Sequence, residues 1–219
     1  MKLKKFVPSL LLFVVFAIYT IIIKTVGVEP IGPLGSSVGF AAINGIVANL
    51  LPYNDLFYKL TKIIAAFAFL YIAGFALLGL IQLIKNKSLK KVDLSIYGMG
   101  ATYIITILFY ALFEVVIINY RPVLEDGELE ASFPSSHTML AVAVFGSAVV
   151  FAAYKIKNKM FKTLFTALSV FLAVAMPFGR LISGVHWFTD IVGGVMLGVS
   201  IVSLYMAFVQ MTVAKENKK

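Results

Sequence analysis

Apolar residues run along the chain in long blocks, and the polar positions gather in short junctions between them. A helix needs roughly 20 apolar residues to cross the hydrocarbon core of a bilayer, so each block of about this length predicts a membrane span. The predicted spans lie at about residues 6–26, 61–84, 96–118, 137–154, 163–178 and 191–212. The block at 163–178 is the shortest, and we expect it to end at Pro177 because a proline interrupts helical hydrogen bonding.

Residues 31–53, between the first two predicted spans, are rich in glycine, proline and other small residues. We expect a re-entrant or interfacial segment here rather than a seventh span, because irregular backbone is not tolerated in contact with lipid tails. The sequence therefore predicts an all-α fold, a polytopic six-transmembrane-helix bundle, in which residues 1–219 form a single integral membrane domain.

Composition supports this class, since 61% of the residues are hydrophobic, 13% are charged and the mean hydropathy is +0.97. Lysines precede the first apolar block, as they do in a signal peptide. The block is long and no small-residue cleavage site follows it cleanly, so we expect it to be retained as a span. The absence of cysteine excludes disulfides and thiolate metal sites.

The distribution of lysines predicts the orientation, because basic residues that flank spans accumulate on the cytoplasmic side. Fourteen of the 19 basic residues lie at alternate junctions, on one side of a six-span bundle: Lys2, Lys4, Lys5, Lys85, Lys87, Lys90, Lys91, Lys155, Lys157, Lys159, Lys162, Lys215, Lys218 and Lys219. We therefore expect both termini in the cytoplasm. The net charge of +9 is then mostly a topology signal, and we expect no nucleic-acid partner.

The two histidines and the two arginines of the chain, together with one aspartate, fall at the opposite ends of the third to sixth predicted spans. They are Arg121, His137, Arg180, His186 and Asp190. Each has a structural interpretation taken alone, such as snorkelling to headgroups, helix capping or a hydrogen bond between helices. Ionisable groups at one membrane depth are costly unless they have partners or a function, so the group as a whole predicts a site.

Spacing indicates what this site binds. If the last helix begins near Gly184, His186 and Asp190 share one face, and Asp190 accepts the imidazole N–H. The other ring nitrogen is then left unprotonated, as a nucleophile requires. Arg180, six residues before His186, presents a planar fork that suits a tetrahedral oxyanion.

Two further segments point to the same ligand. Arg121 is followed by Pro122, which we expect to end the third span and to turn the guanidinium out of the apolar layer. Ser135 and Ser136 stand at the start of the fourth span, where free backbone N–H groups and the helix dipole favour an anion. Helix capping and phosphate binding are compatible at this position, and the assembly predicts a phosphate site.

Three segments of the chain resemble the signature of the type 2 phosphatidic acid phosphatase superfamily, which includes six-helix lipid phosphatases, the vanadium haloperoxidases and glucose-6-phosphatase. They are Arg121-Pro122, Pro134-Ser135-Ser136-His137 and Arg180-x5-His186-x3-Asp190. The superfamily pattern is Lys-x6-Arg-Pro, then Pro-Ser-Gly-His, then Ser-Arg-x5-His-x3-Asp. The resemblance spans about residues 114–190, and a motif in three parts with fixed internal spacing is a specific signal.

The resemblance implies a role for each matching residue. His186 attacks phosphorus to give a phosphohistidine, and Asp190 orients its ring. His137 protonates the leaving group and then activates water. The non-bridging oxygens are bound by Arg121, Arg180, Ser135 and Ser136. The resemblance implies no metal and no cofactor.

The chain departs from the superfamily pattern at three positions. Glu114 stands where the first motif has lysine, Gly179 replaces a serine before Arg180, and Ser136 replaces a glycine. On a continuous helix Glu114 shares a face with Arg121. Three roles of Glu114 stay open: it pairs with an arginine, it acts on a substrate hydroxyl, or it weakens phosphate binding. We expect Glu114, Pro134 and Gly179 to border the site rather than to react.

Four carboxylates precede the fourth span: Glu125, Asp126, Glu128 and Glu130. Their spacing is not that of a metal-binding loop, so we expect a solvated acidic loop and no metal site.

The combined prediction is metal-independent hydrolysis of a lipid phosphate monoester or diphosphate at the outer interface of a bacterial plasma membrane. The resemblance suggests phosphatidic acid, phosphatidylglycerol phosphate or undecaprenyl diphosphate as the lipid partner. Two alternatives stay open, a lipid phosphotransferase and a protein that binds or translocates lipid phosphates without hydrolysis. Residues 31–53 form either a lid or lipid entrance beside the pocket or a simple interfacial connector.

The orientation is tested by reporter fusions at the acidic loop and at the lysine-rich junctions. We expect a fusion within residues 125–130 to report an extracytoplasmic position and a fusion within residues 85–91 to report a cytoplasmic one. A cytoplasmic signal from the acidic loop contradicts the predicted topology.

Overall fold

The computed structural model describes residues 3–124 and 127–216, and within these ranges the chain is helical. The α-helices are α1 Val7–Thr25, α2 Ala41–Leu50, α3 Asp55–Asn86, α4 Leu94–Val115, α5 Ser136–Lys155, α6 Lys159–Ile182 and α7 Phe188–Glu216. Short 3-10 turns lie at Leu3–Phe6, Pro33–Gly35 and Leu89–Lys91. Six helices are long and apolar enough to cross a membrane. The predicted all-α, six-span bundle is confirmed.

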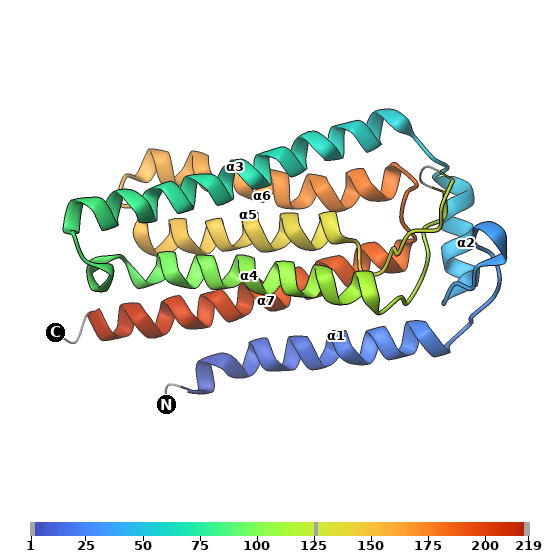
Figure 1. Cartoon of the computed structure of the whole chain (residues 1–219), viewed down its shortest axis with the longest axis horizontal. Coiled ribbons are helices and arrows are strands. Elements are labelled where there is room, and N and C mark those ends of the chain that lie inside the picture. The colour runs from blue at the N-terminus through green and yellow to red at the C-terminus, as the bar shows by residue number, and fades with distance from the viewer. Residues whose placement is uncertain (1–2, 125–126, 217–219) are drawn as a thin grey trace.

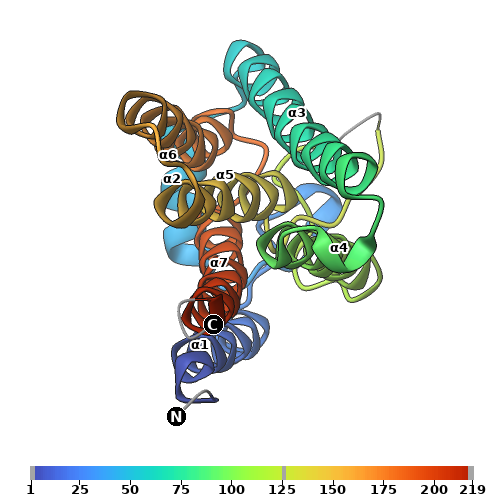
Figure 2. The same cartoon turned by 90° about the vertical axis from the view of Figure 1, so that its left-hand side faces the viewer.

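The six long helices run side by side, with the start of α1 and the end of α7 at the same end of the bundle (Figure 1). The connections α3–α4 and α5–α6 lie at that end too, whereas α2 and the loop before α5 lie at the opposite end (Figure 1). Viewed along the bundle, α5 lies among α3, α4, α6 and α7 (Figure 2). It is the most buried span, with 61% of its most apolar window inside the protein against 17% for α1 and α3.

Glycines allow α5 and α7 to pack closely. A Cβ added to Gly146 of α5 would lie 2.7 Å from a methyl group of Val202, and one added to Gly198 of α7 would lie 2.7 Å from Val142. Small residues at a helix interface let the backbones approach, which is the main source of packing energy between helices in a lipid environment. This contact fixes the two helices whose first turns carry His137 and Asp190.

Phe133 anchors the loop that leads into α5. Its side chain is buried, 1% exposed, in a cluster formed by α1, α4, α5 and α7. Its ring stacks on Phe16 of α1 and meets Phe113 of α4 edge-on, with centroid separations of 6.1 and 5.9 Å. The start of α5 is thereby held by two other helices.

The observed helix ends differ from three predictions. Pro177 does not end its helix, because α6 continues to Ile182. The last turn is stabilised by Ser183, whose N–H donates to Gly179 O at 2.9 Å and whose hydroxyl donates to Arg180 O at 2.7 Å. These bonds satisfy carbonyls at the helix end, which have no partner within the helix.

The other two differences concern loops. The helix before Arg121 ends at Val115, so Pro122 does not terminate it and Arg121 lies in the following loop. The last helix begins at Phe188 rather than near Gly184, so His186 precedes it. In both cases the residue outside the helix makes polar contacts, Arg121 with Glu130 and His186 with Arg180. The local sequence pattern does not reveal these contacts.

The segment between α1 and α3 contains a helix that is too short to span a bilayer. The ten residues of α2 lie at the end of the bundle where α7 begins (Figure 1). The fully buried Asn44 ties α2 to that place: its amide nitrogen donates to Gly39 O at 2.7 Å and to Thr189 Oγ1 at 2.9 Å. Its amide oxygen accepts from the Thr189 N–H at 3.2 Å.

Replacing Asn44 tests whether this attachment stabilises the fold. Asn44→Ala leaves buried groups of Gly39 and Thr189 without partners, which costs about 2 kcal/mol and corresponds to a fall of roughly 5 °C in the unfolding midpoint. Thermal unfolding in detergent measures the effect. Asn49→Ala, at an exposed position of the same helix, is the matched control and should unfold like the wild type. Equal midpoints for both variants contradict this role.

Candidate active site

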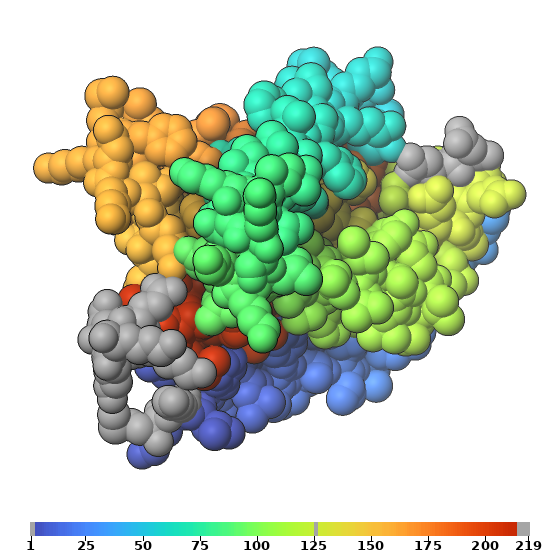
Figure 3. Space-filling model, turned by 60° about the vertical axis from the view of Figure 1, so that its left-hand side comes forward, coloured from blue at the N-terminus to red at the C-terminus, as the bar shows by residue number. Residues whose placement is uncertain are grey.

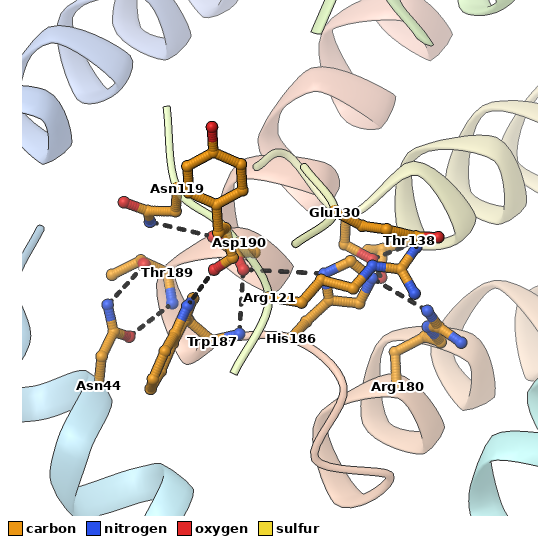
Figure 4. A network of polar contacts seen from close by, with 12 residues as sticks. Asn44, Asn119, Arg121, Glu130, Thr138, Arg180, His186, Trp187, Thr189 and Asp190 are labelled. Atoms are coloured by element: carbon orange, nitrogen blue, oxygen red, sulfur yellow. Dashed lines mark hydrogen bonds and ion pairs between the residues drawn. The ribbon is translucent and has the colours of Figure 1, made fainter. Parts of the chain in front are cut away.

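Arg121, Arg180, His186 and Asp190 come together in one polar network (Figure 4), and His137 lines the same cavity as Arg121. Arg121 comes from the loop after α4, His137 from the first turn of α5 and Arg180 from the last turn of α6. His186 lies in the loop before α7 and Asp190 in its first turn. Three parts of the chain, the loop after α4, the start of α5 and the connection from α6 to α7, thus supply one polar cluster.

His186 lies between an arginine and a carboxylate (Figure 4). Its Nε2 is 3.0 Å from Arg180 Nη2, and its Nδ1 is 3.7 Å from Asp190 Oδ2. A guanidinium only donates hydrogen bonds, so Nε2 is the acceptor and carries no proton. The proton of the neutral ring is therefore on Nδ1, on the side of Asp190.

The surroundings keep this imidazole neutral. Burial lowers the pKa of His186 well below its usual value of 6.5, and the positive charges of Arg180 and Arg121 and the nearby His137 lower it further. The side chain is almost fully buried. A histidine with a depressed pKa presents an unprotonated nitrogen at neutral pH, which is the form that acts as a nucleophile.

Asp190 is held by hydrogen bonds of its own. Its Oδ1 accepts from Asn119 Nδ2 at 3.2 Å, and its Oδ2 accepts from the Trp187 N–H at 3.0 Å. Because Asp190 is the third residue of α7 and Trp187 immediately precedes that helix, the second bond has the arrangement of a capping box. The carboxylate therefore stands beside His186 through this cap and not through a shared helix face.

Arg180 is the largest fully buried side chain of the described residues. Besides its contact with His186, it donates from Nη1 to Thr61 Oγ1 at 3.4 Å. Its guanidinium carbon lies 5.3 Å from the centre of the Tyr58 ring, within the range of a cation–π interaction. Two residues of α3 thus contact the guanidinium.

Arg121 is fixed by Glu130 at two points. The Arg121 Nη2 and Glu130 Oε2 atoms are 3.2 Å apart, and the Arg121 N–H donates to Glu130 O at 3.0 Å. Glu130 is exposed, as expected for a solvated acidic loop, and it also pairs with Arg121. Glu128 is exposed as expected, and Glu125 and Asp126 lie outside the described residues.

The polar side chains at the start of α5 have two roles, helix capping and lining of a cavity. Ser135 is fully buried and caps the helix, with its Oγ 3.5 Å from the Thr138 N–H and 3.0 Å from Thr138 Oγ1. Ser136 and His137 are partly exposed and line a cavity. Capping thus falls to Ser135, and the first two residues of α5 face the cavity.

The cavity has a volume of about 620 Å³ and lies between α3, α4, α5 and the loop after α4. Figure 3 shows this side of the molecule hollowed between α3 and α4, with α5 at the bottom of the hollow. Its apolar wall includes Phe69, Ile72, Ile107 and Leu140, and its polar wall includes Glu114, Arg121, Glu130, Ser136 and His137. A ligand with one polar and one apolar end matches these two walls.

His186 lines a small second pocket that shares a wall with the large cavity. The shared residues are Tyr110, Glu114, Ala131, Ser136 and Met139, and Pro134 also lines the small pocket. The nucleophile candidate therefore lines the small pocket that adjoins the cavity, and not the cavity itself.

Glu114 lies next to the last residue of α4 and lines both pockets. The prediction that Glu114 and Arg121 share a helix face is wrong, because α4 ends at Val115. Among the described residues that line the two pockets there is no lysine. Glu114 thus adds a negative charge to a wall where the resembling motif has a cation.

Several residues of the cluster were not predicted from the sequence. They are Asn44, Tyr58, Thr61, Asn119 and Trp187. Asn119 had a weak signal, since it stands two positions before Arg121 and a buried amide in an apolar chain needs partners. The others act through contacts between distant segments, which a single sequence does not reveal.

Comparison with known proteins gives one family. The model of the PAP2 superfamily matches residues 96–214, more than half of the chain. This range includes all the predicted site residues. It starts in α4 and ends in α7.

Two individual proteins are similar to the chain. The lipid phosphate phosphatase delta of Arabidopsis thaliana is 32% identical over 84 residues, which are 37% of this chain and 20% of that protein. The chain thus spans about a fifth of the length of this curated relative. The crystal structure of a transmembrane PAP2 type phosphatidylglycerolphosphate phosphatase from Bacillus subtilis superposes with a TM-score of 0.58. The superposition covers 96% of this chain and 97% of that one at 19% identity, so the two share a transmembrane fold.

Proposed function

The chain belongs to the type 2 phosphatidic acid phosphatase (PAP2) superfamily, and from this premise we propose that it removes phosphate from a membrane lipid. The substrate is a phosphate monoester or a diphosphate, and the reaction passes through a phosphohistidine without a metal ion. The observation that carries the proposal is the unprotonated Nε2 of His186, held 3.0 Å from the Arg180 guanidinium, in a residue that lines a small pocket next to a partly apolar cavity.

In the first step His186 Nε2 attacks phosphorus, the N–P bond forms and the bond from phosphorus to the leaving oxygen breaks. The ring becomes a cation, and the Asp190 carboxylate on its Nδ1 side stabilises that charge. His137, which lines the cavity, donates a proton to the leaving oxygen. In the second step His137 accepts a proton from water, the water oxygen attacks phosphorus, and His186 is released with inorganic phosphate.

Charge stabilisation is the main requirement of phosphoryl transfer. Arg180 lies next to the attacking nitrogen and is suited to bind the equatorial oxygens as they gain charge. Arg121 faces the cavity beside Ser136, whose hydroxyl and backbone N–H stand at the start of α5. We assign phosphate binding to Arg121, Arg180 and Ser136, and the capping of α5 to Ser135.

The shape of the cavity supports a lipid substrate. A volume of about 620 Å³ is typical of a ligand site, and the apolar side chains of α3 and α4 accommodate part of an acyl or isoprenoid chain. The similar proteins are named for lipid phosphate and phosphatidylglycerolphosphate. Phosphatidic acid, phosphatidylglycerol phosphate and undecaprenyl diphosphate are therefore the substrates to test.

The distribution of lysines indicates on which side of the membrane the site lies. The lysine-rich connections α3–α4 and α5–α6 lie at the end of the bundle opposite to the site (Figure 1). If that end is cytoplasmic, as the positive-inside rule requires, the site faces the extracytoplasmic side, for which we propose the plasma membrane of a bacterium.

Glu114 favours one competing function. A carboxylate on the wall of the phosphate cavity repels a phosphate dianion and lowers its affinity, which suits a protein that binds or translocates the lipid without hydrolysis. The same carboxylate also accepts hydrogen bonds from hydroxyl groups of a glycerol headgroup. Hydrolysis and binding are separated by measuring the products.

The assay is phosphate release by the purified protein in detergent with a metal chelator, on each of the three lipids. We expect release from at least one lipid and a loss of about 10³-fold or more for His186→Ala, because removing a covalent nucleophile abolishes its step. Glu128→Gln, in the exposed part of the acidic loop, is the matched control and should keep wild-type activity.

Three outcomes contradict the proposal. Equal release by the wild type and His186→Ala excludes the phosphohistidine. Lipid binding without release indicates a binding or translocating protein. Transfer of the phosphate to an added alcohol or lipid acceptor, with no free phosphate, indicates a phosphotransferase.

A further inference from the structure

Gly179 and Thr61 are in close contact across the interface between α6 and α3. A Cβ added to Gly179 would lie 2.7 Å from Thr61 Cγ2, well inside van der Waals contact. Thr61 is fully buried. The space beside α6 at position 179 is therefore filled by the threonine side chain.

The hydroxyl of Thr61 has a defined direction. It donates its single proton to Tyr58 O at 2.7 Å within α3. Its oxygen then accepts from Arg180 Nη1 at 3.4 Å. Since a guanidinium is a rigid planar fork, fixing Nη1 also fixes Nη2, the atom that lies 3.0 Å from His186 Nε2.

Two further contacts between α3 and the end of α6 also hold the region around Arg180 in place. The Tyr58 ring lies against the guanidinium of Arg180. The Asn54 N–H, just before α3, donates to Ser183 O at 3.0 Å, just after α6. The beginning of α3 is thus attached to the end of α6 on both sides of Arg180.

We propose that Thr61 and Gly179 form a matched pair in which the glycine makes room for a threonine that positions Arg180 for phosphate binding. The resembling motif has a serine at position 179, on α6. In this chain the hydroxyl beside the arginine comes instead from α3. Thr61 lines neither pocket, so it is a positioning residue and not a catalytic one.

A merely space-filling threonine would behave differently from a positioning one. Thr61→Val keeps the shape and removes the hydroxyl, whereas Thr61→Ser keeps the hydroxyl and removes the methyl group that opposes Gly179. The positioning role depends on the hydroxyl, and the matched pair depends on the methyl group. The two substitutions separate these effects.

The proposal rests on the proposed function, so the test uses two readouts. One is kcat/KM for the hydrolysed lipid. The other is binding of orthovanadate, an oxyanion that mimics the phosphoryl group in transfer, followed through its effect on the unfolding midpoint. Vanadate binding reports on Arg180 even if no lipid is hydrolysed, so failure of the two proposals is distinguishable.

We expect Thr61→Val to lower kcat/KM and the vanadate affinity about tenfold with little change in the midpoint measured without vanadate. Thr61→Ser should stay within about twofold of the wild type for both readouts. Thr102→Val is the matched control, because Thr102 is buried in α4 and its hydroxyl donates to Gly98 O of its own helix. It should leave both readouts unchanged. Wild-type values for Thr61→Val overturn the positioning role.

The pairing is tested with Gly179→Ala in two backgrounds. Alone, Gly179→Ala should lower the unfolding midpoint and the vanadate affinity, because the new methyl group meets Thr61 Cγ2. Combined with Thr61→Ser, which removes that methyl group, it should recover most of both losses. Equal losses in the two backgrounds overturn the matched pair.

Discussion

The contact between Arg180 Nη2 and His186 Nε2 is the interaction on which the rest of the site depends. A guanidinium cannot accept a hydrogen bond, so this contact fixes the tautomer of His186, with the lone pair of Nε2 directed at Arg180. Arg180 is fully buried, and burial of a charge is costly without partners. The first turns of α3 and the loop before α7 supply partners of Arg180, and the geometry of the cluster follows from that requirement.

Each helix end at the site is set by a polar contact rather than by local helix preference. α6 continues past Pro177 to Ile182, Ser183 bonds to its last carbonyls, and this extension carries Arg180. α7 begins only at Phe188, where Asp190 caps it and stands beside His186. Asn44 then attaches the short α2 to the same turn. The apolar bundle provides a rigid frame, and these caps place the reactive groups within it.

The bundle could be predicted because the signals for it are local in the sequence. The length of each apolar block predicts a span, and the lysine-rich junctions predict the direction in which each span crosses the membrane. The convergence of Arg121, His137, Arg180, His186 and Asp190 followed from that order and from the motif spacing. The helix ends could not be predicted, since Pro177 and Pro122 carry strong local signals that tertiary contacts override. The role of Thr61 was not predicted either, because it depends on a contact with Arg180, 119 positions away in the sequence. The prediction that Glu114 and Arg121 share a helix face was wrong because α4 ends at Val115, although both residues line the cavity.

The most direct test of the account is to stop turnover of a phosphate-labelled lipid within milliseconds and to locate the label by mass spectrometry at alkaline pH, where phosphohistidine survives. The account predicts phosphate on His186 in the wild type. No labelled phosphate is expected in His186→Ala. Continued turnover with no labelled histidine, or with the label on another residue, would contradict the assignment of His186 as the nucleophile.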